Sequence, residues 1–274
     1  MHTAVALNSR TPAPLLMPRE GHIASSHSHR AEAKSYPGWW HEHLCLADGL
    51  SEQELARLDE ILFTRRAVRR GDYLYRAGQA FSCLYAVRSG CFKTSVLLED
   101  GRTQVTGFQM AGDLVGIDGI GTGRHVSEAM ALEDSEVSVI QFERLEALTR
   151  QIPSLQRNLH RLLSREIVRE HEVMMLLGSM RAEERLAAFL LSLSQRLSAR
   201  GYSANNFNLR MTREEIGSYL GLKLETVSRA FSRFQEDRLI SVHQKHIRIL
   251  DVEGLRWPAW AGRSSRPPAE RAAA

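Results

Sequence analysis

The chain has 274 residues, of which 43% are apolar, enough for two modest hydrophobic cores. No apolar run approaches the ~20 residues needed to span a bilayer, and the first ten residues lack the apolar core of a signal peptide. Three cysteines, an odd number in a long chain, argue against a disulfide framework. We therefore expect a cytoplasmic protein with no membrane partner. Its net charge of +4 is compatible with nucleic acid binding but does not demonstrate it.

Residues 1–43 are predicted to form a flexible arm, because they contain several prolines and show no sustained hydrophobic periodicity. Near the end of this arm, His41, His43 and Cys45 form an H-x-H-x-C string whose side chains suit zinc or copper. A structural metal site needs a fourth partner, and none is visible nearby. The spacing favours polar residues that lead into a helix, so no metal site is predicted and these three are kept only as candidates.

Residues 44–152 are predicted to begin with a helix and to continue as a small β jelly roll. The segment SEQELARLDEIL has a capping box at Ser51, and its leucines recur on one face. Ten of the nineteen glycines then lie between Gly71 and Gly123, where they separate β-rich runs such as SCLYAVRS, CFKTSVLL and TQVTGFQM. Many short strands with glycine corners are typical of a jelly roll or barrel. Cys83 and Cys91 fall in these strands, and we interpret both as small buried apolar residues.

A long helix is predicted over residues 153–180, with an apolar stripe whose spacing suits a helix packed against its twin. The predicted dimer contacts are Leu159, Leu163, Ile167, Glu170, Met174 and Leu177. Glu170 would face its own copy in a symmetric pair, and two buried like charges disfavour association. One hypothesis is that Glu170 weakens the dimer, so that assembly depends on a signal or on DNA. The other is that its carboxylate lies at the flank and bends out to water.

Residues 181–252 are predicted to contain two short helices joined by a tight turn. Thr212 and Glu215 have the spacing of a capping box at the start of the first helix. Gly221 supplies the positive φ that lets the chain reverse direction sharply, and Leu222 is expected to fill the corner between the helices. This arrangement predicts a helix-turn-helix.

The second helix carries apolar residues at three- and four-residue spacing, and we expect these to point inward: Leu224, Val227, Phe231 and Phe234. This spacing turns Glu225, Ser228 and Arg229 outward together. An arginine can donate two hydrogen bonds to guanine and a carboxylate can accept from cytosine, so the trio suits readout of a DNA major groove. The other interpretation is an amphipathic helical hairpin with a solvated charged face.

Two short β-prone runs, at residues 240–242 and 247–250, predict a hairpin wing after the second helix. Hydroxyl and cationic side chains near the helices and the wing are expected to hold the DNA backbone. The expected phosphate contacts are Thr212, Lys223, Thr226 and Lys245. Residues 253–274 are predicted to form a flexible tail.

The run AEERLAAFLLSLSQRLSARGYSANNFNLRMTREEIGSYLGLKLETVSRAFSRFQ, residues 182–235, resembles the DNA-binding domain of the CRP/FNR family of bacterial transcription regulators, in its FNR branch. The core ETVSR is the most specific part of the match. In that branch the corresponding glutamate, serine and arginine read a TTGAT half-site, which implies base contacts by Glu225, Ser228 and Arg229. Leu224 supports the same branch, because the CRP branch carries an arginine at that position.

The resemblance covers roughly residues 44–250 and implies an α+β fold. Its parts are an N-terminal cyclic-nucleotide-binding-like jelly roll, a long dimerisation helix and a C-terminal winged helix-turn-helix. Lys223 departs from the pattern, because FNR-like proteins usually carry there a threonine able to cap the recognition helix. Losing a cap costs about 1 kcal/mol, although a lysine can hold a phosphate as a point charge.

The positions that hold cyclic AMP in CRP-like proteins are poorly matched. Where those proteins place a glutamate for the ribose and an arginine-serine pair for the phosphate, this chain has Ile117, Ser127 and Glu128. A phosphate would meet a carboxylate, and Arg124 lies too far from the aligned position to be assumed a substitute. We therefore do not expect cyclic AMP as the ligand.

FNR-type proteins hold a 4Fe-4S cluster with four cysteine thiolates, three near the N-terminus and one in the barrel. Only Cys45 matches one of these positions, because Tyr36, Trp39 and Ser138 occupy the other three. One thiolate cannot hold a four-iron cluster, so we do not expect this cofactor either. The signal that the barrel senses stays unknown at this stage.

The sequence thus favours a homodimeric transcription regulator that binds double-stranded DNA at a TTGAT-N4-ATCAA palindrome and contacts RNA polymerase. The alternative is a ligand-sensing or scaffolding module that regulates a protein partner without reading bases. Glu225, Ser228 and Arg229 discriminate between the two, because docking gives no reason for this trio. An enzyme is not expected, since no nucleophile with an adjacent base, phosphate loop or paired metal motif is present.

Overall fold

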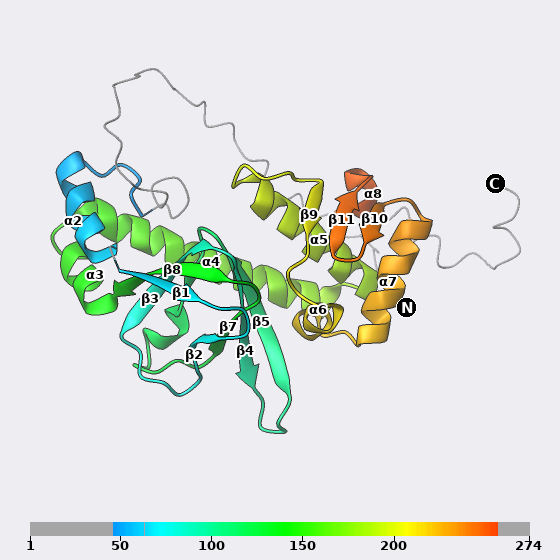
Figure 1. Ribbon diagram of the computed structural model, residues 1–274, viewed down its shortest axis with the longest axis horizontal. Coiled ribbons are helices and arrows are strands. Elements are labelled where there is room, and N and C mark those ends of the chain that lie inside the picture. Colours follow the sequence, from blue (N-terminus) through cyan, green and yellow to red (C-terminus); the bar gives the residue numbers. More distant parts are fainter. Residues whose placement is uncertain (1–45, 63, 257–274) are drawn as a thin grey trace, which may run out of the picture. The chain divides into compact units, whose positions relative to one another are not determined.

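The computed structural model describes residues 46–62 and 64–256, and Figure 1 shows the order of their elements. The predicted arm and the candidates His41, His43 and Cys45 lie outside these residues. The N-terminal part contains α2 (Glu52–Leu62), eight strands and α3 (Phe142–Thr149). The strands are β1 (Arg65–Val68), β2 (Tyr73–Tyr75), β3 (Cys83–Ser89), β4 (Cys91–Leu97), β5 (Thr103–Met110), β6 (Leu114–Val115), β7 (Glu128–Ala131) and β8 (Ser135–Gln141).

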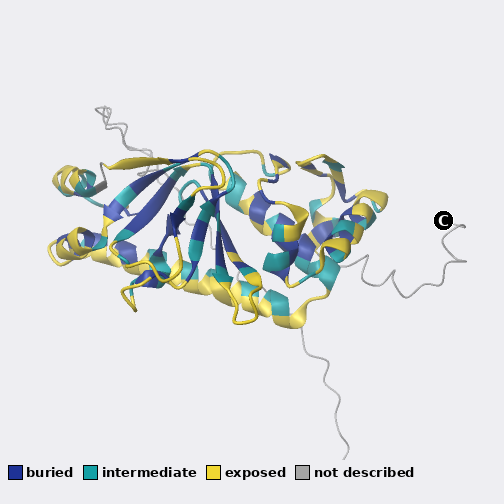
Figure 2. Ribbon diagram, turned by 60° about the horizontal axis from the view of Figure 1, so that its bottom comes forward, coloured by how far each residue is buried: buried dark blue, intermediate teal, exposed yellow. Residues whose placement is uncertain are grey.

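These strands form two four-stranded sheets, in the orders β1-β8-β3-β6 and β2-β7-β4-β5. All their pairings are antiparallel. One buried cluster takes side chains from both sheets, for example Val87 and Val137 from the first and Tyr75 and Phe92 from the second. The predicted jelly roll is confirmed, and Figure 2 shows the buried faces of its strands in dark blue.

Helices cover the outer face of the first sheet. The Ser51 amide donates to Glu54 Oε2 at 2.7 Å and the Glu54 amide donates to Ser51 Oγ at 3.4 Å, so the predicted capping box at the start of α2 is present. A second buried cluster joins α2 and α3 to the start of α4 (Pro153–Ser179). Within it the Asn158 amide donates to the backbone carbonyls of Leu46 (3.0 Å) and Asp48 (2.8 Å), which ties α4 to the segment before α2.

The apolar stripe of α4 is divided between two surroundings. Leu159 is buried in the cluster under the barrel, and Leu163 packs against the same cluster. Ile167 and Met174, further along the helix, are 55% and 59% exposed. Leu159 is therefore wrong as a predicted dimer contact, because its own chain already covers it. Helical spacing alone does not tell which partner a residue meets.

The C-terminal part is a winged helix-turn-helix, as predicted. It contains α5 (Ala182–Ser198), β9 (Asn206–Asn208), α6 (Arg213–Leu220), α7 (Leu224–Glu236), β10 (Ile240–His243), β11 (His246–Ile249) and α8 (Val252–Arg256). The strands pair in the order β10-β11-β9. Leu255 in α8 is 2% exposed and belongs to the core of this part. The predicted start of the tail at residue 253 is therefore wrong, because the last helix closes this core.

The same core receives side chains from strand β5 of the barrel. Val105, Phe108 and Met110 are buried with residues of α5, α6 and α7. The ring of Phe108 lies 5.3 Å from that of Tyr219, between centroids. The barrel and the helix-turn-helix thus share one continuous apolar contact. Throughout the described residues, every helix is too short or too polar to cross a membrane.

Candidate nucleic-acid interface

The first helix of the motif, α6, begins at the predicted capping box. The Glu215 amide donates to Thr212 Oγ1 at 3.1 Å, and the Thr212 amide donates to Glu215 Oε2 at 2.7 Å. Two of the amides that a helix leaves without a partner at its first turn are satisfied in this way. The inward residues Ile216 and Leu220 are both 0% exposed. The cap fixes where α6 begins, and the buried residues fix which side of the helix faces the core.

Two glycines make the turn between α6 and α7. Gly221 has φ = 62°, the left-handed conformation predicted for it, and Leu222 packs into the core after it. Gly217 was not singled out by the sequence pattern. A Cβ on Gly217 would lie 2.6 Å from the backbone oxygen of Leu222, so the turn folds back too closely for any larger residue. The angle between the helices depends on this contact.

The second helix, α7, buries one face and exposes the other. Val227, Phe231 and Phe234 are 0%, 1% and 0% exposed, as the spacing predicts, and Ala230 completes the buried face at 4%. Leu224 is 45% exposed, so its predicted inward position is wrong. It is the first residue of the helix, next to the open turn, and the core does not reach it.

The proposed reading residues lie on the opposite face of α7. At 100° per residue Glu225, Ser228 and Arg229 fall within an arc of about 100° on the helix. Glu225 and Arg229 are exposed and Ser228 is half-buried. Within the described residues, neither the Glu225 carboxylate nor the Arg229 guanidinium has a hydrogen bond or ion pair to another side chain. The hydrogen-bonding groups of both side chains are therefore available to a molecule that binds this face of α7.

Around this face lie the predicted phosphate contacts. Lys223 is the N-cap residue of α7 and makes no side-chain hydrogen bond to the helix, so the expected loss of a cap is confirmed. Thr212 and Lys223 are exposed and Thr226 is half-buried. Lys245 lies exposed in the turn of the wing, where β10 and β11 pair from His243 to His246. Figure 1 shows the wing beside α7.

Helix α6 is also attached to the barrel, through contacts that the sequence did not reveal. Lys93 Nζ in β4 lies 2.7 Å from Glu215 Oε1, and both side chains are less than 20% exposed. The backbone amide of Val105 donates to Ser218 Oγ at 2.9 Å. Burial raises the pKa of Glu215, but hydrogen bonds from Lys93 and from the Thr212 amide lower it below its ordinary value overall. Glu215 therefore joins the barrel to the start of the DNA-reading motif.

A second polar junction lies at Asp113, in the turn between β5 and β6. Its carboxylate accepts from Arg196 in α5 and, at 2.6 Å, from Arg200, which follows the end of α5. Arg169 in α4 donates to the backbone oxygen of Phe108, 2.8 Å away, beside this carboxylate. Burial raises the pKa of Asp113, but the three guanidinium groups hold it below its ordinary value. The turn, the long helix and α5 are thus held around one anion.

The carboxylate of Asp118 binds Ser127, one of the positions aligned with the phosphate partners of CRP-like proteins. Asp118 Oδ2 accepts from the amides of Val126 (2.9 Å) and Ser127 (2.7 Å), and from Ser127 Oγ (2.8 Å). Glu128, the other aligned residue, accepts from Ser95 Oγ at 3.2 Å. Arg124 is exposed and donates to the Gly78 oxygen at 2.8 Å. These residues do not fit a cyclic nucleotide, because its phosphate would compete with Asp118 and be repelled by it.

The described residues do not fit an iron-sulfur cluster either. Ser138, at the position of the barrel ligand, is 1% exposed and offers a hydroxyl, to which Arg88 Nη1 donates at 3.4 Å. Burial raises the pKa of Cys91 to about 12, so in the metal-free protein its side chain is a neutral thiol. Among residues 46–62 and 64–256, no three His, Cys, Asp or Glu side chains are placed to hold a metal ion. Cys45, Tyr36 and Trp39 lie outside the described residues.

Comparison with protein families agrees with this architecture. Residues 65–151 match the cyclic nucleotide-binding domain, and residues 184–256 match the Crp-like helix-turn-helix domain. The fold and its exposed helix therefore define a DNA-binding protein of the winged helix-turn-helix class with an N-terminal sensor-type barrel.

Several relatives narrow the class further. The transcriptional regulatory protein btr of Bordetella pertussis is 49% identical over 214 residues, which are 78% of this chain and 88% of that protein. The fumarate and nitrate reduction regulatory protein of Salmonella typhimurium is 45% identical over 77% of this chain and 85% of its own length. The structure of FixK2 from Bradyrhizobium japonicum has a TM-score of 0.64 and 31% identity, over 70% of this chain and 94% of that one. The chain belongs to the CRP/FNR family of DNA-binding transcription regulators, which is not a family of enzymes.

Proposed function

We propose that the protein binds, as a homodimer, a palindrome of the form TTGAT-N4-ATCAA and regulates promoters through RNA polymerase. The observation that carries the proposal is the shared, exposed face of Glu225, Ser228 and Arg229 on α7. Its opposite face is anchored in the core, so the trio is presented on a rigid element. Because the partner is chromosomal DNA, the regulator would act in the cytoplasm.

The chemistry of base reading follows from these side chains. Arg229 can donate to guanine O6 and N7, and Glu225 can accept from the amino group of a cytosine. Ser228 can serve a base edge or a neighbouring phosphate. Thr212, Lys223, Thr226 and Lys245 would hold the DNA backbone and set the register, because phosphate contacts position a protein without reading sequence.

A dimer is required by this geometry, because one recognition helix reads only a few base pairs and a palindrome presents two half-sites. We propose that the contact is made by the exposed part of α4. Ile167 and Met174 from the predicted stripe are exposed there, and so are Val168 and Met175, at 53% and 63%. Figure 2 shows the exposed face of α4 in yellow. Leu163 and Leu177, which are half-buried, would contribute at the edges.

The base-reading proposal is tested by fluorescence anisotropy with a TTGAT-N4-ATCAA duplex and a scrambled duplex at matched salt. Replacement of Arg229 by alanine should reduce the preference for the palindrome by about 1 to 3 kcal/mol per half-site, roughly 5- to 150-fold. Arg150→Ala, at an exposed arginine after α3, is the matched control and should keep the preference. A parent protein that binds both duplexes equally would refute the proposal.

The role of Glu170 is tested by sedimentation velocity. Glu170 is exposed and lies between Ile167 and Met174. If it faces its own copy, Glu170→Ala should dimerise at a lower concentration than the parent, because a pair of like charges is removed from the contact. Glu172→Ala, on another side of the same helix, serves as the control. If the parent and Glu170→Ala dimerise at the same concentration, the other hypothesis holds, in which the Glu170 carboxylate lies at the flank of the contact and points to water.

A further inference from the structure

One arginine contacts three backbone carbonyls where three helices meet. Arg185 lies in the first turn of α5 and is half-buried. Its guanidinium donates through Nη2 to the Leu177 oxygen of α4 at 2.7 Å, and through Nε to the oxygen of Met180, just after α4, at 2.9 Å. Through Nη1 it donates to the oxygen of Leu220, the last residue of α6, at 3.0 Å. One side chain therefore joins the end of α4, the start of α5 and the end of α6.

These carbonyls accept from a side chain because helices end there. The last four carbonyls of an α-helix have no amide partner within the helix, and the C-terminus of a helix carries partial negative charge. A guanidinium suits this position, since it is always charged and presents several N–H donors in one plane. A lysine ammonium would supply the charge but not the planar fork. The contact thus depends on the shape of the arginine as well as on its charge.

The junction between α4 and α5 is short and not helical. Only Met180 and Arg181 separate the two helices, and both have extended backbone, with φ and ψ of −101° and 148° and of −74° and 165°. Rotation about these bonds would change the angle between α4 and α5. Arg185 opposes this rotation, because it holds Leu177 before the junction and Met180 within it.

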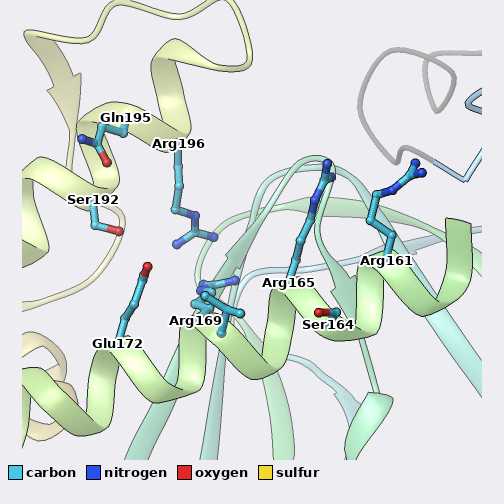
Figure 3. Close-up of a pocket in the computed structure, with 9 residues that line it drawn as sticks. Arg161, Ser164, Arg165, Arg169, Glu172, Ser192, Gln195 and Arg196 are labelled. Carbon is cyan, nitrogen blue, oxygen red and sulfur yellow. The ribbon is translucent and has the colours of Figure 1, made fainter. Parts of the chain in front are cut away.

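Close packing of α4 against α5 does not fix this angle further along. A cavity of about 420 Å³ lies between the two helices, and Figure 3 shows Arg169 of α4 and Arg196 of α5 on its walls. Both guanidinium groups donate to the backbone oxygen of Phe108 in the barrel, each at 2.8 Å. In this stretch each helix is attached to the barrel, whereas Arg185 links α4 directly to α6.

This link bears on the position of the recognition helix α7. Leu220 is followed by Gly221, which begins the turn into α7. A Cβ at Gly221 would lie 3.5 Å from Arg185 Nη1 and 3.6 Å from Leu177 Cδ2, so the turn lies directly against the end of α4. The close contact at Gly217 keeps the turn tight. A movement of α6 relative to α4 would therefore carry α7 with it.

We propose that Arg185 is a positioning residue that sets the spacing between the two half-sites that the dimer accepts. The inference rests on the proposed binding of a homodimer to palindromic DNA. In that dimer α4 lies at the twofold contact and α7 in each half-site, so the angle held by Arg185 decides how far apart the two copies of α7 lie. One base pair added to the spacer moves a half-site by about 3.4 Å and turns it by about 35° around the duplex. A rigid junction would reject such a site, and a loose junction would accept it.

Fluorescence anisotropy on the full-length protein tests the proposal. The probes are TTGAT-N3-ATCAA, TTGAT-N4-ATCAA and TTGAT-N5-ATCAA duplexes and a scrambled duplex, at matched salt. The parent should prefer the N4 spacer by about tenfold or more, since a displaced half-site loses its base contacts. Arg185→Gln should bring the three affinities within about threefold of one another, and Arg185→Lys, which keeps the charge but not the fork, should lie between. Both variants should still prefer the N4 palindrome over the scrambled duplex, because the reading face of α7 is unchanged.

Ile249→Val is the control for a loss of stability that leaves the junction intact. Ile249 lies in β11 and is 4% exposed in the core of the same domain, so its shortening lowers stability without touching Arg185. This variant should keep the parental preference for the N4 spacer. Urea unfolding followed by circular dichroism compares the stability of all three variants. If Arg185→Gln does not fold, the same comparison is made with Arg185→Lys.

The outcomes separate this proposal from the proposed function. A parent that binds the palindrome and the scrambled duplex equally refutes both. A parent that reads the palindrome but binds all three spacers alike overturns the role of Arg185 alone, and so does a parental spacer preference in Arg185→Gln. The role is also overturned if Ile249→Val loses the preference as the Arg185 variants do. If neither Arg185 variant folds, Arg185 serves the stability of the domain and the proposal is again wrong.

Discussion

Replacement of Asp113 by asparagine should strongly destabilise the protein. The Asp113 carboxylate accepts from the Met110 amide at 2.8 Å and from the guanidinium groups of Arg196 and Arg200. Asparagine keeps the shape but loses the charge, and its NH₂ group would oppose a guanidinium donor. Two or more cations would then remain around a neutral group.

The expected loss can be estimated from burial. The Asp113 side chain is 13% exposed, so solvent screens its ion pairs little. Breaking a buried ion pair by removing one partner costs about 3 to 5 kcal/mol. The folded-state pKa of Asp113 is lowered, so the stabilisation is present above the unfolded value of about 3.9 and is lost as pH falls through the folded value. The difference between parent and variant should be full above pH 5 and should shrink below about pH 4.

Urea unfolding followed by circular dichroism measures this difference at several pH values. Asp100→Asn is the control. Asp100 is exposed in the β4-β5 turn, so its replacement should change the urea midpoint of unfolding little. A variant at Asp113 as stable as the parent at pH 7 would refute the reasoning. So would a difference between the two that stays constant down to pH 3.

Two further predictions concern the DNA-binding part. Gly217→Ala should lower stability by about 1 to 3 kcal/mol in thermal unfolding, because the Cβ would meet the Leu222 oxygen at 2.6 Å, whereas Gly121→Ala has open space and should be neutral. Unchanged stability of Gly217→Ala would mean that the turn can relax. Lys245→Gln should lower the affinity of the protein for the palindromic and the scrambled duplex by the same factor. It should also reduce the slope of log K for DNA binding against log salt concentration by about 1. A sequence-selective loss would instead make Lys245 a base contact.

Much of the DNA-reading motif was predictable because it is built from local interactions. A capping box needs residues three apart, as in Thr212 and Glu215, and a left-handed turn needs a glycine such as Gly221. The inward and outward faces of α7 follow from helical periodicity over thirteen residues. Leu224 shows the limit of this approach, since periodicity gives a direction but not how far the core extends.

The candidate sensor site was predictable only in part. Alignment with the family indicated that Ser127 and Glu128 are poor partners for a phosphate. It did not reveal that Asp118 occupies the amides of Val126 and Ser127, because that contact depends on the conformation of the loop.

By itself the sequence determined the family, the order of the domains and the face of α7 that meets solvent, since each depends on residues close together in the chain. Only the tertiary structure decided how these parts are joined. Lys93 forms an ion pair with Glu215, which is 122 positions away in the sequence. Leu159 packs in the apolar cluster beneath the barrel of its own chain and does not face a second copy. Such contacts depend on which surfaces the folded backbone brings together, and no local spacing encodes that choice.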